Sequence, residues 1–149
     1  MKTSDKQVRE TLGNEPEWQK LYVLTEHWQS DLEFYKDDLR FLHHLVDKYF
    51  IWITKSENLE MVREIVLQVT DLQKRCEELI KKVLDHRHDL TYFENNTEAT
   101  KWQQALEQHA EMEKEIYTFV KEFRANRKEV FRITEYVIDS EQLTDLIRS

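Results

Sequence analysis

Glycine and proline are almost absent from this sequence. The 149 residues contain one of each, Gly13 and Pro16. Hairpin turns depend on residues that accept positive φ or hold φ fixed, so a β-rich fold would need several more of both. Their scarcity therefore excludes a sheet-based architecture. It also excludes phosphate-binding loops, dinucleotide fingerprints and nucleophile elbows, because all of these are built on glycines.

Cysteine and long apolar runs are also scarce, which limits where the protein is expected to work. Cys76 is the only cysteine, so no internal disulfide can form and a reducing compartment is favoured. The N-terminal residues open no apolar segment of the kind that directs secretion. The longest apolar run, Tyr49–Ile53, is far shorter than a membrane span. We therefore predict a cytoplasmic protein that has no contact with a membrane.

Long runs of positive charge are missing as well. The chain has 22 Lys and Arg against 30 Asp and Glu, which gives a net charge of −8. Nucleic acids and anionic membranes are bound by clustered Lys and Arg, so neither is expected as a partner. The acidic residues alternate with basic ones and read as solvated helix faces.

What the sequence does contain is apolar residues at helical spacing. Three segments, 18–53, 62–93 and 102–137, repeat apolar residues at gaps of three and four without losing phase. The polar breaks between them, 54–57 and 94–98, are short, so neighbouring helices must run antiparallel. The sequence therefore predicts an all-α fold, an antiparallel bundle of three long helices followed by a short C-terminal helical segment.

Local signals place the ends of these helices. Asn14 is expected to cap the first helix, the Thr54–Glu57 capping box the second, and Asn95 or Asn96 the third. Residues 1–13 are expected to form a disordered tail ahead of a single domain at 14–149. The tail at 140–148 either continues the third helix or turns back.

The 94–98 connection sets a register between the second and third helices. It places Lys82 opposite Glu115 and Arg75 opposite Glu122, and both pairs are opposite in sign. It also brings His86 and His109 to one level of the core. A buried polar layer of this kind fixes register in helical bundles, and we favour that interpretation.

A metal site at His86 and His109 is the alternative interpretation. His27, Glu26 or Glu113 would have to complete it, because two ligands make a poor site. The paired Glu-x-x-His motifs of di-iron bundles are absent. We therefore predict no catalytic residue and no cofactor, and we read Cys76 as inert core packing.

A second apolar column lies outside the seam. Phe34 and Phe41 on the first helix, and Tyr117 and Phe131 on the third, occupy positions that should see solvent. Trp52 continues the column on the first helix, either as inner packing or as part of the same surface. Four aromatic residues along one groove exceed the single apolar residues that a surface tolerates.

This groove between the first and third helices suggests a protein-binding role. The C-terminal tail, a second copy in a homodimer, or a helix of another protein could cover it. The tail is too short to reach the whole groove, so an intermolecular contact is favoured. We therefore expect a non-enzymatic interaction or scaffold protein. A bundle that binds a metal or small ligand at its histidine layer is the alternative.

Overall fold

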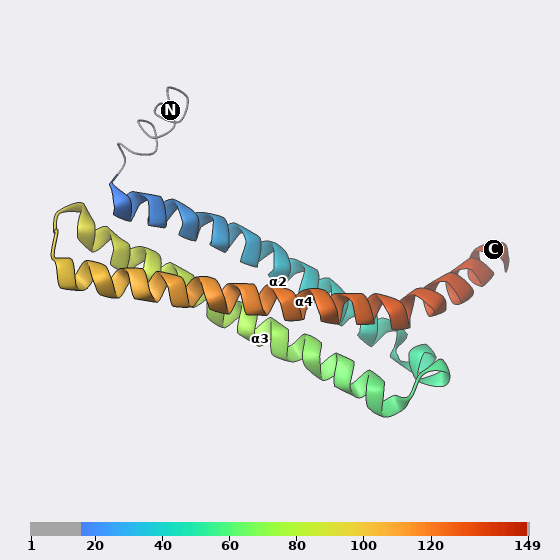
Figure 1. Ribbon diagram of the computed structural model, residues 1–149. Coiled ribbons are helices and arrows are strands. Elements are labelled where there is room, and N and C mark those ends of the chain that lie inside the picture. Colours follow the sequence, from blue (N-terminus) through green and yellow to red (C-terminus); the bar gives the residue numbers. More distant parts are fainter. Residues whose placement is uncertain (1–15, 149) are drawn as a thin grey trace, which may run out of the picture. The chain divides into compact units, whose positions relative to one another are not determined.

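The computed structural model describes the backbone of residues 16–148 and the side chains of residues 16–135 other than residue 56. This part of the chain contains three long helices, one short 3-10 helix and no strand (Figure 1). The elements are α2 (Glu17–Ser56), α3 (Leu59–Leu90), the 3-10 helix η1 (Thr91–Glu94) and α4 (Ala99–Arg148). The predicted all-α fold of three long helices is confirmed. The predicted tail at 1–13 and the cap at Asn14 lie outside the described residues.

The first turn of α2 is described from Pro16 onwards, and the start of α3 differs from its predicted cap. The carbonyl of Pro16 accepts the first backbone hydrogen bonds of α2, from Gln19 and Lys20. At the first break the chain remains helical through residue 56, and Asn58 caps α3 by accepting a 3.1 Å hydrogen bond from the Met61 amide. The predicted capping box at Thr54 was therefore wrong, because the Thr54 hydroxyl donates back to Ile51 within α2 instead.

The second connection also departs from the predicted cap. The side-chain Nδ2 of Asn96 donates to the backbone carbonyl of Tyr92 at 2.8 Å. The side chain therefore closes η1 instead of capping α4. The first turn of α4 begins on the carbonyl of Glu98, which accepts from the Trp102 amide. At the other end, α4 continues as one helix to Arg148, so the C-terminal segment does not turn back over the bundle.

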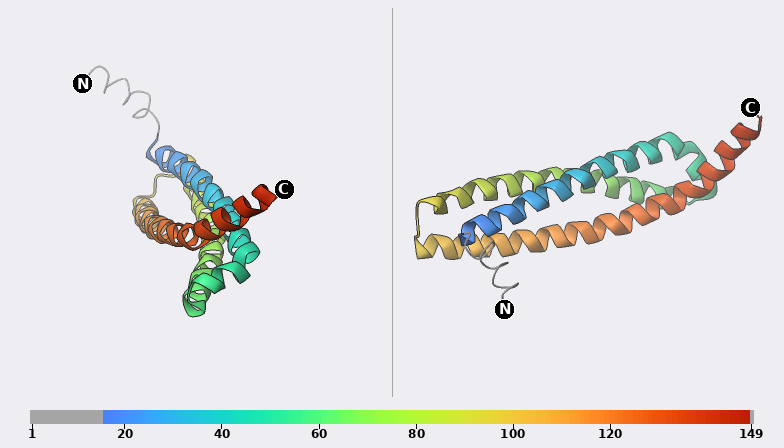
Figure 2. Two further views of the ribbon diagram at one scale, coloured as in Figure 1. Left: turned by 90° about the vertical axis from the view of Figure 1, so that its right-hand side faces the viewer. Right: turned by 90° about the horizontal axis from the view of Figure 1, so that it is seen from above.

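The three helices contribute to two compact units. Unit 1 combines the part of α2 up to Glu33 with Leu79–Glu115, and unit 2 combines Phe34–Glu78 with Ile116 onwards. Within each unit, α3 runs opposite to α2 and α4 (Figure 2). Each unit is therefore a small antiparallel three-helix arrangement. The single domain at 14–149 stays a prediction.

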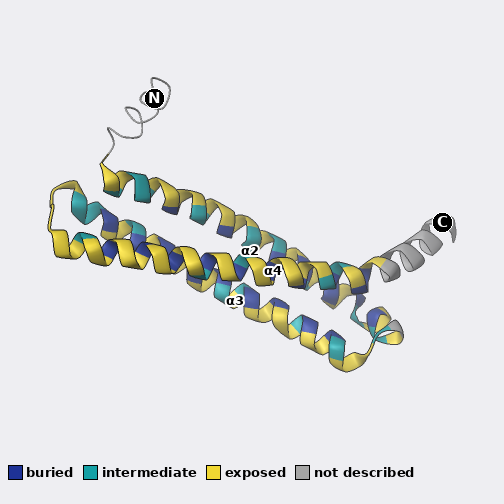
Figure 3. Cartoon of the chain, viewed as in Figure 1, coloured by how far each residue is buried: buried dark blue, intermediate teal, exposed yellow. Residues whose placement is uncertain are grey.

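Buried residues follow the predicted stripes in both units (Figure 3). In unit 2 the core is mainly aliphatic and aromatic, with Leu39, Val69 and Phe119 among its most buried side chains, and it also contains the polar residues Asn126 and Thr134. In unit 1 the stripe includes buried polar residues, which are Thr25, His86 and His109. No described helix combines the length and apolar character that crossing a membrane requires.

Two ion pairs confirm the register between α3 and α4. In unit 1, Nζ of Lys82 lies 3.0 Å from Oε1 of Glu115. In unit 2, Nη1 of Arg75 lies 2.8 Å from Oε1 of Glu122. Both pairs were expected from the heptad pattern and the length of one connection. Their presence in both units shows that the phase holds along the two helices.

Candidate functional site

A hydrogen bond joins two histidines inside unit 1. Nε2 of His86 on α3 lies 3.0 Å from Nδ1 of His109 on α4. The two residues are only 3% and 8% exposed, because both occupy inward positions of their heptad stripes. The structure therefore brings together the two histidines that the register places at one level.

The pair leaves two ring nitrogens unsatisfied. Nδ1 of His86 and Nε2 of His109 are buried and have no hydrogen-bond partner within the described part of the chain. Each neutral ring has one N–H and one bare nitrogen, and the bond between the rings uses the N–H of one and the bare nitrogen of the other. Whichever ring donates, its remaining nitrogen is an acceptor without a donor, and the remaining N–H of the other ring is a donor without an acceptor. Each costs about 1–3 kcal/mol. The layer is thus better suited to specifying register than to adding stability.

Burial keeps both imidazoles neutral. Burial, with a smaller contribution from the neighbouring His86, lowers the pKa of His109 to about 4. Burial also lowers the pKa of His86, and the carboxylate of Asp89 and the side chain of Gln108 partly oppose this effect. Gln108 lies near the His86 ring without forming a hydrogen bond of good geometry to it. At neutral pH the pair therefore carries no charge.

Helix α2 covers the pair with groups that do not bind metals. The indole of Trp28 stacks on the His109 ring, with centroids 4.5 Å apart and planes inclined by 28°. One turn away on α2, Thr25 accepts two hydrogen bonds from Arg87 of α3. Its hydroxyl accepts from Nε at 3.1 Å and its backbone carbonyl from Nη2 at 3.0 Å. The α2 side of the layer is therefore closed by an aromatic ring and a satisfied threonine.

The residues proposed to complete a metal site lie elsewhere. Glu26, His27 and Glu113 are all exposed. Within residues 16–135, no three His, Cys, Asp or Glu side chains converge in the way that holding a metal requires. In addition, one ring of the His86–His109 pair uses a lone pair for the shared hydrogen bond. The positions of these side chains therefore do not support a metal site at His86 and His109.

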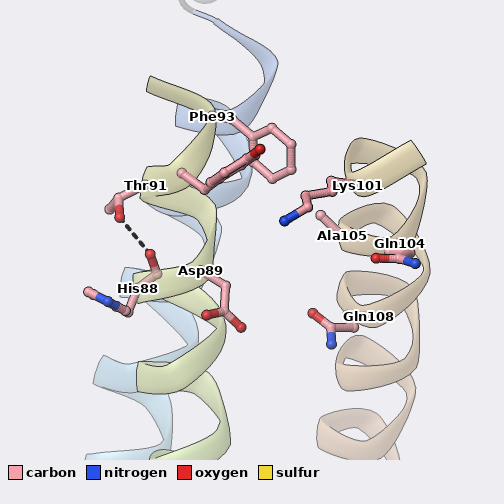
Figure 4. Close-up of a pocket in the computed structure, with 9 residues that line it drawn as sticks. His88, Asp89, Thr91, Phe93, Lys101, Gln104, Ala105 and Gln108 are labelled. Carbon is pink, nitrogen blue, oxygen red and sulfur yellow. Dashed lines mark hydrogen bonds between the residues drawn. The ribbon is translucent and has the colours of Figure 1, made fainter. Parts of the chain in front are cut away.

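A polar cleft of about 530 Å³ lies in unit 1 near this layer (Figure 4). Asp89 from α3 and Gln108 from α4 face each other across it, and these are the two residues that act on the pKa of His86. Lys101 enters from the same α4 wall, and its Nζ lies 4.7 Å from the centre of the Tyr92 ring. The cleft therefore gives solvent access to the polar surroundings of the buried histidines.

The predicted contact residues all fall in unit 2. Phe34 and Tyr117 are the most exposed, at 67% and 70%, and Phe41 and Trp52 are exposed as well. Phe34, Phe41 and Trp52 share one flank of α2, because spacings of seven and eighteen residues return to nearly the same helix face. We call the set of Phe34, Phe41, Trp52, Tyr117 and Phe131 the aromatic surface.

Phe131 is less accessible than the sequence suggested. It is half-buried, because its ring meets Phe41 at a centroid distance of 6.4 Å and the guanidinium of Arg127 lies 4.7 Å above it. Arg127 is held in place by Asp38, whose carboxylate accepts from Nε at 2.7 Å. The α2–α4 contact in unit 2 is thus an aromatic pair with an ion pair beside it.

The aromatic surface is tied to the core by ring contacts. Phe34 packs edge-on against Tyr35, with centroids 6.0 Å apart. Tyr35 in turn contacts the buried rings of Phe119 and Phe123 at 6.2 and 4.9 Å. The backbone beneath Phe34 is therefore well packed, and its exposed ring is presented from a rigid helix.

Heptad reasoning missed the contacts made by long or planar side chains. The Trp28–His109 stack and the Arg87–Thr25 bonds involve residues whose reach extends beyond one layer. Trp28 did stand on the core stripe, so its position was a signal that it would pack near Thr25 and the histidines. Arg87 gave no such signal, because its heptad position is typical of a solvent-exposed residue.

Comparisons with other proteins add no assignment. No protein-family model matches the chain, and neither a curated protein nor a solved structure shows significant similarity to it.

Proposed function

We propose that this chain is a non-enzymatic interaction module, which binds a second copy of itself or a helix of another protein through the aromatic surface. The observation that carries the proposal is the exposure of Phe34 and Tyr117, at 67% and 70%. Burying one such side chain is worth about 1.5–3 kcal/mol. Several aromatic residues on one pair of helices therefore represent a large free energy that a partner would recover.

The local packing supports binding over a purely structural role for these residues. Phe34 and Tyr117 are not needed to fill the core, because Phe119, Phe123 and Leu39 already fill it. Aromatic side chains have few rotatable bonds and large contact areas, so they are common anchors at protein interfaces. The ring contact from Phe34 to Tyr35 further reduces the entropy that binding would cost.

The setting that we propose is a reducing compartment, the cytoplasm. The single cysteine supports it, since Cys76 is fully buried in unit 2 and is available for neither an exposed thiol chemistry nor an internal disulfide. The proposal includes no nucleic-acid partner, because the net charge of −8 opposes binding to phosphates.

Sedimentation velocity at micromolar concentration tests the proposal. Wild type is expected to sediment above the monomer, and Phe34→Glu/Tyr117→Glu is expected to sediment as a monomer, because charge at both sites opposes their burial. The matched control is Leu84→Glu/Leu106→Glu, which makes the same kind of change at two exposed leucines of unit 1. A control that loses association equally, or a wild type that stays monomeric, would contradict self-association through this surface.

A further inference from the structure

Unit 2 carries an acidic cleft between α3 and α4. The cleft has a volume of about 570 Å³, and four carboxylates and one guanidinium stand among the residues that line it. Its charged lining residues are Glu64, Asp71, Glu122, Glu129 and Arg75. The charges of the lining sum to −3, so the cleft favours a cationic occupant.

The cleft also has an apolar wall and an unmet acceptor. Leu67 projects from α3 at 66% exposure and lines the cleft beside Leu72 and Ala125. Asn126 lines it as well and is 3% exposed. Its Nδ2 donates to the Ile65 carbonyl and to Gln68, but its Oδ1 has no hydrogen-bond partner within the described residues. That oxygen is buried beneath the cleft surface, so an occupant does not reach it. A suitable occupant therefore brings apolar surface and positive charge.

The outward flank of α4 in the same unit has the opposite character. A shallow depression of about 540 Å³ is lined there by four basic residues, one acidic residue and an aromatic ring. These residues are Arg124, Arg127, Lys128, Arg132, Glu135 and Phe131. We call this the basic surface. Its charges sum to +3, and Phe131 also belongs to the aromatic surface.

Ion pairs within the chain neutralise only part of each surface. Arg75 is shared by Asp71 and Glu122, and Arg132 is bound by Glu129 and Glu57. Arg127 is bound by Asp38. Among the described residues, Glu64 on the acidic side and Arg124 and Lys128 on the basic side form no ion pair. Glu135 on the basic side forms none among the described residues either. The unpaired charges are therefore one acid in the cleft and two bases and one acid on the basic surface.

We infer that the acidic cleft of one copy receives the basic surface of a second copy. This inference rests on the proposed self-association. It adds a second contact beside the aromatic surface, with which the basic surface shares Phe131.

With Glu129, Arg127 and Arg132 neutralised by their partners in the same chain, the cleft keeps a charge of −2 (three carboxylates and Arg75) and the basic surface a charge of +1 (Arg124, Lys128 and Glu135). The two surfaces are therefore still opposite in sign. Phe131 offers an aromatic ring to the exposed Leu67, and Arg124 and Lys128 bring unpaired positive charge to Glu64. Because every copy carries both surfaces, each copy can make the contact twice, once through its cleft and once through its basic surface.

Charge exchange tests this pairing on the intact chain. One variant, Glu64→Lys/Asp71→Lys, makes the cleft basic, and the other, Arg124→Glu/Lys128→Glu, makes the basic surface acidic. Each variant alone then opposes like charges in both contacts, and its association is expected to weaken at least about tenfold. In the equimolar mixture both contacts are again between opposite charges. Sedimentation of the mixture is expected to recover the wild-type association to within about threefold.

A matched control separates this contact from general attraction between oppositely charged proteins. Lys81→Glu/Lys114→Glu changes the net charge as much as the second variant does, but at exposed lysines of unit 1. Mixed with the cleft variant, it should not restore association. Circular dichroism first establishes that each variant keeps its helices.

Three outcomes overturn the inference. These are a mixture that fails to associate, a control that restores association equally, and single variants that associate like wild type. Phe34 and Tyr117 line neither surface. If Phe34→Glu/Tyr117→Glu abolishes association while the charge variants leave it unchanged, the proposed function stands and the pairing of acidic cleft with basic surface falls.

Discussion

Units 1 and 2 are built from the same three helices, but they carry their unusual side chains in opposite locations. In unit 1 the exceptions lie inside, where His86 and His109 replace aliphatic residues at one level of the core. The core of unit 2 also holds two polar residues, Asn126 and Thr134, but neither of them ionises. What distinguishes unit 2 lies outside, where Phe34, Phe41, Trp52 and Tyr117 are exposed. The exposed large apolar residues of unit 1 are aliphatic, and they are Val23, Leu24, Leu84 and Leu106.

The difference separates two physical consequences. A polar pair inside a core lowers stability and makes it depend on pH, but it leaves the surface unchanged. Aromatic residues outside a core contribute little to stability and much to association. We therefore expect unit 1 to respond most to protonation and unit 2 to respond most to partners.

The largest effect is expected from truncating the core of unit 2. Phe119 is fully buried, and Phe119→Ala should lower the free energy of unfolding by about 3–5 kcal/mol, because it removes a ring and leaves a cavity. Phe34→Ala, which removes an exposed ring on the same unit, should change it by less than about 0.5 kcal/mol. Urea denaturation followed by circular dichroism measures both. Similar costs at the two positions would mean that Phe34 is part of the core after all.

The second effect is a loss of stability in acid that originates in unit 1. The folded-state pKa of His109 is about 4, below its ordinary value of 6.5, so the unfolded chain binds the proton first as pH falls. The stabilisation is complete above pH 6.5 and is lost as pH falls towards 4. That loss should be roughly 3 kcal/mol from His109.

Variants isolate this effect from the carboxylates that titrate in the same range. His86→Leu/His109→Leu replaces both partners at once, so it leaves no buried nitrogen unmet and should flatten the difference between pH 6.5 and pH 4. His27→Gln/His88→Gln removes two exposed histidines and should leave the wild-type pH dependence intact. Equal pH dependence in wild type and the leucine variant would show that the buried pair does not control acid stability.

The heptad pattern predicted whatever depends on helix phase. His86 meeting His109, and Arg75 meeting Glu122, both follow from one connection length, since a heptad phase fixed at one level is kept along two continuous helices. The helix ends were predicted less well. Asn58 caps α3, where Thr54 had been predicted to do so. Several polar residues in a break can each cap a helix, and the packing on both sides decides between them.

The candidate sites were predicted only in part, for a related reason. The exposure of Phe34 and Tyr117 follows from their helix positions, but the half-buried state of Phe131 depends on Arg127 and Phe41 lying over it. The acidic cleft was not predicted, because its lining comes from two helices that are each unremarkable in sequence. Surface chemistry that depends on the reach of long side chains is not encoded in apolar periodicity.

The smallest expected effect compares one ion pair from each unit. In unit 2, Arg75 meets Glu122 with two hydrogen bonds, of 2.8 and 3.4 Å. In unit 1, Lys82 meets Glu115 with one bond of 3.0 Å. A planar guanidinium loses less freedom for each bond that it forms, whereas the lysine ammonium is a flexible point charge.

Double-mutant cycles to alanine measure the coupling within each of these pairs. We expect about 0.5–1 kcal/mol for Arg75–Glu122 and about 0.2–0.5 kcal/mol for Lys82–Glu115, because both pairs are largely solvated. Raising the salt concentration should reduce both couplings, and the lysine pair should lose the larger fraction because it relies on charge alone. A larger coupling for Lys82–Glu115 would mean that the fork geometry of Arg75 adds nothing at this surface. The register of α3 and α4 would then be held as firmly by a point charge in unit 1 as by a bidentate pair in unit 2.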